Sequence, residues 1–104
     1  MDSLVSAREG AMDIRKACAR ALRQARTQKG LTQEDFSMVS SRTYLSALER
    51  GMKSPTLEKV EAIAGKLSVH PVTLLVLTYL QDEEYGSIED SLGLVTDEVK
   101  ELSR

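Results

Sequence analysis

Leu45 and Leu48 are three residues apart, a spacing that places both side chains on one face of a short helix. An arginine on the opposite face could donate two parallel hydrogen bonds to the O6 and N7 atoms of guanine. The methyl groups of threonine and alanine could contact thymine, and a serine hydroxyl suits several base edges. These residue types at this spacing suit either a helix that reads bases in the major groove of double-stranded DNA or an ordinary polar helix face. The candidates are Arg42, Thr43, Ser46 and Ala47.

Polar groups beside this helix could hold the phosphate backbone. The aligned N–H groups at helix starts attract anions, and neighbouring hydroxyl, amide and ammonium groups can add direct contacts. Arg15, Arg23 and Lys29 could add positive field without a specific contact. The candidates for phosphate contacts are Gln33 at the start of the preceding helix, Ser41 as the cap of the base-reading helix, Tyr44, and Lys53 in the following loop.

The residue types give no support to enzyme chemistry. One cysteine, Cys18, and one histidine, His70, exclude an internal disulfide and a multi-cysteine zinc site. We expect Cys18 to pack in the core and His70 to cap a helix. The chain has no phosphate-binding glycine loop, no nucleophile elbow, and no histidine near a nucleophile. We therefore expect no catalytic residue, no metal and no other cofactor.

Helical periodicity dominates and predicts an all-α fold. Apolar residues recur at steps of three and four over residues 13–29, and Gly30 supplies the left-handed residue that ends such a helix. Thr32 with Asp35 predicts a capped second helix over about residues 33–39. The base-reading helix then extends from its Ser41 cap towards Gly51.

Two serine- or histidine-proline pairs predict the next helix starts. Ser54 with Pro55, and His70 with Pro71, each offer a cap followed by proline at the first helical position. Two weaker helical segments follow, at 87–92 and 96–102, each opening on a serine or threonine cap. We expect an N-terminal arm (1–12), a helical domain (13–80) and an acidic helical extension (81–104) that forms part of a dimer interface. The fourth helix should bury Leu57, Val60, Ile63, Ala64 and Leu67.

Charge is unevenly distributed along the 104 residues. Residues 1–80 carry 12 Lys and Arg against 8 Asp and Glu, whereas residues 81–104 carry 2 against 8. The net charges of +4 and −6 indicate a basic body with either an acidic binding tail or a solvated acidic helix face.

The longest apolar stretch, 72–80, is far below the ~20 residues that span a bilayer, and the N-terminus lacks a signal-peptide core. We expect a cytoplasmic, nucleoid-associated chain with no membrane partner.

Four short motifs follow one another in a characteristic order. They read G-L-T-Q at 30–33, S-R-T-Y-L-S at 41–46, L-E-R-G at 48–51 and S-P-T-L-E at 54–58. Over about residues 20–77 the chain resembles the Cro/C1-type (XRE) helix-turn-helix family. The resemblance implies a compact five-helix, lambda-repressor-like bundle, here with additional short C-terminal helices, that binds operator DNA as a dimer.

The resemblance also carries one structural pair and one departure. In the family, the glutamate that matches Glu49 pairs with an arginine of the first helix, here Arg26, which implies a half-buried ion pair. Only four residues separate Phe36 from Ser41, about two fewer than is usual in the family, and none is glycine. We expect the second helix to lose half a turn, or the turn to tighten.

The run 72–80 is apolar around nearly its whole circumference, although a final helix of so small a domain needs only one apolar stripe about 100° wide. We expect Leu74, Leu75 and Leu77 to face the core. An outward patch of this kind marks a partner surface, which a two-fold axis would make self-complementary. The C-terminal segments could cover the rest of it, exchange with the partner, or fold back within one monomer, and they would do so through Leu92, Val95, Val99 and Leu102. The patch comprises Val72, Val76, Tyr79 and Leu80.

These features favour a sequence-specific transcriptional regulator, a repressor or activator, that occupies a palindromic operator as a homodimer. An antitoxin or anti-repressor, which would use the same fold or the acidic tail to hold a protein, is the alternative. A small enzyme is the least supported class, because no nucleophile–base pair is present. No small-molecule ligand is expected, since the chain is too short for an added ligand domain.

Overall fold

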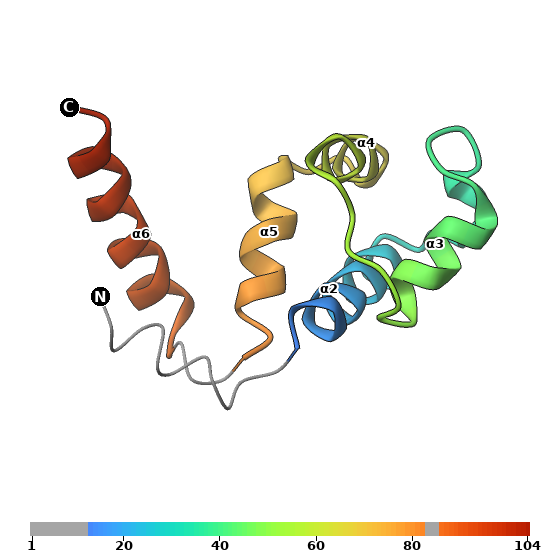
Figure 1. Ribbon diagram of the computed structural model, residues 1–104, viewed down its shortest axis with the longest axis horizontal. Coiled ribbons are helices and arrows are strands. Elements are labelled where there is room, and N and C mark those ends of the chain that lie inside the picture. The colour runs from blue at the N-terminus through green and yellow to red at the C-terminus, as the bar shows by residue number, and fades with distance from the viewer. Residues whose placement is uncertain (1–12, 83–85) are drawn as a thin grey trace. The chain divides into compact units, whose positions relative to one another are not determined.

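The computed structural model describes residues 13–82 and 86–104, and every regular element within these ranges is helical (Figure 1). The all-α prediction is therefore confirmed. The expected N-terminal arm (1–12) and residues 83–85 lie outside the described residues. All elements up to α5 belong to one compact unit, and α6 belongs to another. The elements are α2 (Ile14–Gln28), the 3-10 helix η1 (Glu34–Phe36), α3 (Arg42–Glu49), α4 (Leu57–Leu67), α5 (Pro71–Tyr79) and α6 (Ile88–Leu102).

Helix α2 begins and ends where its sequence signals lie. Asp13 caps it by accepting a hydrogen bond from the backbone N–H of Arg15 at 2.8 Å, which lowers the pKa of the Asp13 carboxyl. Gly30, with φ of 71°, adopts the left-handed conformation that reverses the chain after the helix. The buried face of α2 then packs against α3 and α5.

The second helix is shorter than predicted. Only the three residues of η1 are helical, so the expectation of a helix over 33–39 is wrong. Thr32 and Asp35 do cap its start reciprocally, with N···O distances of 2.7 and 3.2 Å. The chain then turns at once, because the backbone N–H groups of Val39 and Ser40 both donate to the carbonyl of Phe36 at 2.9 Å. Loss of regular helix and a tight turn together accommodate the short connection.

Helix α4 starts later than Ser54 and Pro55 predict. Its cap is Thr56, whose hydroxyl accepts the backbone N–H of Lys59 at 3.1 Å. Leu57 is then the first helical residue and is 75% exposed, so its expected place in the core is also wrong. The capping side chain, not the proline, sets the boundary.

Helix α5 follows its prediction closely. His70 caps it through Nδ1, which accepts the backbone N–H of Val72 at 3.0 Å, and Pro71 is its first residue. Proline costs nothing at this position because its missing N–H would have had no helical partner.

Helix α6 replaces the two C-terminal segments that were expected. Ser87 caps it, accepting the backbone N–H of Asp90 at 3.0 Å, and the helix continues to Leu102. Thr96 lies inside the helix and does not cap a second one. A glycine inside a helix costs about 1 kcal/mol relative to alanine, a penalty that does not break this helix at Gly93.

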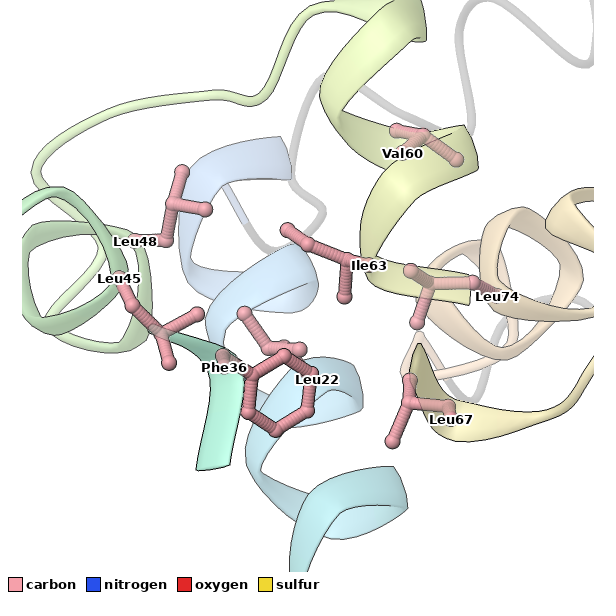
Figure 2. Close-up of a cluster of buried hydrophobic side chains, with 8 residues drawn as sticks. All are labelled: Leu22, Phe36, Leu45, Leu48, Val60, Ile63, Leu67 and Leu74. Carbon is pink, nitrogen blue, oxygen red and sulfur yellow. The ribbon is translucent and has the colours of Figure 1, made fainter. Parts of the chain in front are cut away.

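One apolar cluster joins all five elements of the first unit, as Figure 2 shows. Phe36 projects from η1 against the leucines of α2 and α3 and is fully buried. The cluster therefore fixes α3 on the rest of the domain. Its members are Leu22, Phe36, Leu45, Leu48, Val60, Ile63, Leu67 and Leu74.

Two leucines of α4 should respond differently to truncation. Leu67 is 1% exposed, so Leu67→Ala should lower the free energy of unfolding by about 2–5 kcal/mol through lost burial and a residual cavity. Leu57→Ala, in the same helix, should change it by no more than about 0.5 kcal/mol. Urea denaturation measures both. Equal losses in the two variants would contradict the placement of Leu57 outside the core.

Candidate nucleic-acid interface

Helix α3 presents one polar side away from the core. Its first turn is capped by Ser41, whose hydroxyl accepts the backbone N–H of Tyr44 at 3.1 Å. Arg42 and Thr43 are exposed, and Ser46 is partly exposed. The side chain of Arg42 has no ion-pair or hydrogen-bond partner in the described part of the chain. Its guanidinium donors are therefore available to a ligand.

Ala47 does not belong to the exposed side. It is 7% exposed, so the expectation that it faces DNA with the other three candidates is wrong. The chain reverses at Gly51, with φ of 73°, and the backbone N–H of Met52 then donates to the carbonyl of Ala47 at 3.0 Å.

A buried ion pair attaches α3 to α2. Arg26 donates from Nε to Oε2 of Glu49 at 2.6 Å and from Nη2 to Oε1 at 2.8 Å. The Glu49 side chain is only 2% exposed, and that of Arg26 14%, so this pair is more deeply buried than the resemblance implies. Arg26 also donates to the carbonyl of Leu31 at 3.0 Å, which ties the loop after α2 to the same pair.

Arg26 and Glu49 shift each other's pKa. The hydrogen bond with Glu49 raises the pKa of Arg26. Burial by itself would raise the pKa of Glu49, but hydrogen bonds from Arg26 and Gln33 outweigh it and hold that pKa below its ordinary value. Both groups are therefore charged over the whole neutral range.

Glu49 has two further partners. The side-chain amide of Gln33 donates to Oε1 at 3.1 Å, so this phosphate candidate is held by the buried carboxylate. An amide nitrogen carries two hydrogens, and the second can serve a phosphate. Arg23 donates to the backbone carbonyl of Glu49 at 3.1 Å and lies 3.8 Å from its carboxylate. Sequence reasoning gave Arg23 only a field effect, although its spacing of three from Arg26 places both on one face.

The ring of Tyr44, in the first turn of α3, lies close to two lysines. The ammonium groups of Lys53 and Lys59 lie 5.7 and 5.4 Å from the centre of its ring. Lys59 also donates to the carbonyl of Val39 at 2.9 Å, which closes the short turn before α3. Sequence reasoning missed Lys59, because no pattern around it indicates a contact twenty residues away. Lys53 is exposed and remains available to an anion.

The predicted partner surface on α5 is only partly exposed. Val72 and Tyr79 are 53% and 47% exposed, whereas Val76 and Leu80 are intermediate. The inward prediction is confirmed for Leu74, which is buried, and for Leu75, which packs against the core cluster, whereas Leu77 is only partly covered.

Thr78 is buried in the inward face of α5, which the apolar pattern did not indicate. Its hydroxyl donates to the carbonyl of Leu74 at 2.9 Å, which satisfies the polar group inside the helix. Cys18 of α2 packs beside it: burial raises the pKa of the thiol, and a hydrogen bond with Thr78 partly offsets this.

Neither a metal centre nor a membrane span is indicated by the described residues. They contain no group of three or more His, Cys, Asp or Glu side chains that could hold a metal ion. No single helix among them combines the length and apolar composition of a bilayer span, although α4 and α5, bent by 104°, pass the same criteria as a pair.

A capped polar helix, fixed on its neighbours by a buried ion pair and preceded by a tight turn, defines a helix-turn-helix domain. The family model described as helix-turn-helix matches residues 22–74, about half of the chain. The chain belongs to this family, the Cro/C1-type (XRE) transcription regulators, whose members bind DNA and are not enzymes.

Three relatives illustrate the similarity. The chain is 41% identical over 69 residues, 64% of this chain and 90% of the relative, to y4dJ, an uncharacterized HTH-type transcriptional regulator of Sinorhizobium fredii (strain NBRC 101917 / NGR234). It is similar to the clp gene regulator ClgR from C. glutamicum, at 29% identity and a TM-score of 0.62, over 67% of this chain and 94% of that one. It is also similar to the restriction-modification controller protein C.Esp1396I, solved as a tetramer with its natural 35 base-pair operator, at 27% identity and a TM-score of 0.58, over 65% of this chain and 92% of that one.

Removal of Arg26 should destabilise the domain. Arg26→Ala leaves the Glu49 carboxylate buried without its main partner, at a cost of about 3–5 kcal/mol in the free energy of unfolding at pH 7. Because the folded-state pKa of Glu49 is lowered, its contribution is present above the unfolded pKa of about 4.3 and is lost as the pH falls further. The difference in the free energy of unfolding between Arg26→Ala and wild type should therefore become smaller at acidic pH.

Urea denaturation at pH 7 and at pH 3 measures the difference in the free energy of unfolding between Arg26→Ala and wild type. Arg20→Ala is the matched control, since Arg20 is exposed on the same helix and has no ion-pair partner in the described ranges. A loss in Arg26→Ala no greater than that of the control would show that the pair contributes nothing to folding.

Proposed function

We propose that the protein is a sequence-specific transcriptional regulator that occupies a palindromic operator as a homodimer, with α3 in the major groove. The observation that carries this proposal is the exposed first turn of α3. The guanidinium of Arg42 in this turn has no partner in the described part of the chain, while the opposite face of the helix is fixed in the core. A helix held in this way can enter the groove without rearrangement.

Base reading is assigned to Arg42, Thr43 and Ser46. Arginine supplies a two-donor fork for guanine, the threonine methyl suits thymine, and the serine hydroxyl suits several base edges. The small side chains beside Arg42 allow the helix to approach the bases closely. Ala47, which is buried, is left out of this set.

Phosphate contacts are assigned to groups around the start of α3. The Ser41 hydroxyl accepts from the helix and can still donate its own hydrogen, and the second amide hydrogen of Gln33 is available. Tyr44 and Lys53 add a phenolic hydroxyl and an ammonium group on the same side. Such contacts set the position of the helix on the duplex but carry no sequence information.

The two classes of contact predict different mutant phenotypes. Arg42→Ala should cost about 1–3 kcal/mol on the preferred operator and relax the choice of base at one position in each half-site. Lys53→Ala should weaken binding to all sequences similarly and reduce the slope of log K against log salt by about 1. Fluorescence anisotropy with operator and scrambled duplexes at several salt concentrations measures both. Identical behaviour of the two variants would contradict the assignment of α3 as the base-reading helix.

The homodimer is assigned to the outer surface of α5. Val72 and Tyr79 are about half exposed there, with Val76 and Leu80 beside them. A two-fold axis at this patch would let one surface serve both subunits, and a palindrome needs recognition helices about 34 Å apart. The similarity to C.Esp1396I, solved as an oligomer on its operator, supports assembly on DNA.

Charge on the α5 patch should separate the subunits. Val76→Glu combined with Tyr79→Glu should give folded monomers with weaker operator binding, because two carboxylates per chain would be buried in the interface. Sedimentation velocity and anisotropy measure these effects. Leu57→Glu, which adds a charge at an exposed leucine outside the patch, is the control. A double variant as dimeric as the control would place the interface elsewhere.

The acidic segment 81–104 favours a second candidate function, an antitoxin or anti-repressor that holds a protein partner. Its net charge of −6 suits a basic surface and repels DNA. A pull-down in the absence of DNA separates the two functions. For the regulator we expect no small-molecule ligand and a nucleoid-associated, cytoplasmic location.

A further inference from the structure

Helix α6 has an exposed apolar face along its length. None of its residues is buried, and all six of its large hydrophobic side chains are at least 38% exposed. A helix of 15 residues is marginal in water without a packing partner. The six side chains are Ile88, Leu92, Leu94, Val95, Val99 and Leu102.

Five of these side chains follow the spacing of a helix-pairing seam. Their successive separations are four, three, four and three residues, which average the 3.5-residue repeat that keeps one stripe facing a partner helix. Leu94 is the only one of the six outside this stripe. We call the stripe the α6 seam: Ile88, Leu92, Val95, Val99 and Leu102.

The residues beside the α6 seam are compatible with an identical partner. Three of the five flanking positions carry small hydroxyl side chains, and the other two carry Glu89 and Glu98. Most charged residues lie on the far side, where Glu101 and Arg104 form an ion pair at 3.6 Å. The three small flanking residues are Ser91, Thr96 and Ser103.

The charge distribution along α6 favours antiparallel pairing. Its first turn carries two acidic residues, Glu89 and Asp90, whereas in its last turn Lys100 and the following Arg104 offset the acidic Glu101. A parallel pair would bring the two acidic first turns together. An antiparallel pair instead places each acidic start near the less acidic end of the other helix, where Lys100 lies, and also opposes the helix dipoles.

We propose that the α6 seam packs against the α6 seam of a second copy of this chain, in the antiparallel sense. This inference rests on the proposed homodimer, because so short a seam needs the millimolar effective concentration that a tether supplies. The α5 patch brings two chains together, and α6 adds a second contact that strengthens the same dimer. The occupant of the α6 seam is thus another copy of α6.

Two neighbouring substitutions in the full-length chain test the proposal. Val95→Asp places a charge in the α6 seam, and Leu94→Asp places the same charge on the adjacent residue outside it. The two side chains are almost equally exposed, at 49% and 48%, so the added charge is equally solvated in both variants. Leucine is a better helix former than valine, so Leu94→Asp lowers the local helix propensity by more and is a stringent control. Sedimentation equilibrium should show a dimer dissociation constant raised by about tenfold or more for Val95→Asp and unchanged for Leu94→Asp.

Circular dichroism and thermal melting serve as folding controls, because the apolar cluster of the first unit includes neither residue. Equal dissociation constants in Val95→Asp, Leu94→Asp and wild type would overturn the proposal. The same dimer measurements give a different result if the proposed α5 interface is wrong. In that case Val76→Glu with Tyr79→Glu leaves the dimer intact while Val95→Asp still weakens it, a result that supports the α6 contact.

Discussion

The buried carboxylate of Glu49 is the constraint on which the domain depends. A charge that is 2% exposed would be prohibitive without partners, and here Arg26 binds it with both ends of its fork while Gln33 supplies a third hydrogen bond. The three residues lie on α3, on α2 and just before η1. Satisfying one carboxylate therefore fixes the last turn of α3 relative to both preceding elements, and with it the direction in which Arg42 projects.

The short connection between η1 and α3 contains little regular helix and is stabilised by specific hydrogen bonds instead. The carbonyl of Phe36 accepts from two successive backbone N–H groups, and Lys59 reaches across from α4 to the carbonyl of Val39. Phe36 itself is buried among the leucines of α2 and α3. The turn thus loses regular helix and keeps both its hydrogen bonds and its apolar anchor.

Much of the fold could be predicted because it rests on local signals. Gly30 ends α2 and His70 caps α5 through interactions within a few residues, which a sequence pattern can express. Where two local signals competed, sequence could not choose: Thr56, not Ser54, caps α4, since the capping hydroxyl that is correctly placed decides the boundary. Gly93 and Thr96 predicted a break between two short helices. The free-energy cost of placing them inside a helix is small, however, and α6 continues through both residues.

The site was less predictable, because several of its features depend on distant chain segments. Ala47 is 7% exposed although its spacing places it beside exposed residues of α3, and Arg23 donates to a carbonyl 26 residues away. Helical spacing places a residue on a side of its own helix, but it carries no information about which other segment covers that side. The exposed positions of Arg42 and Thr43 followed from spacing because no such segment approaches them among the described residues.

Selection of bound sequences from a pool of random duplex DNA tests most directly whether α3 reads bases. A homodimer with α3 in the major groove should enrich one palindromic sequence, with half-site centres about 10–10.5 base pairs, or a multiple of that, apart and a guanine in each half. A bound pool that shares no sequence would contradict base reading by α3.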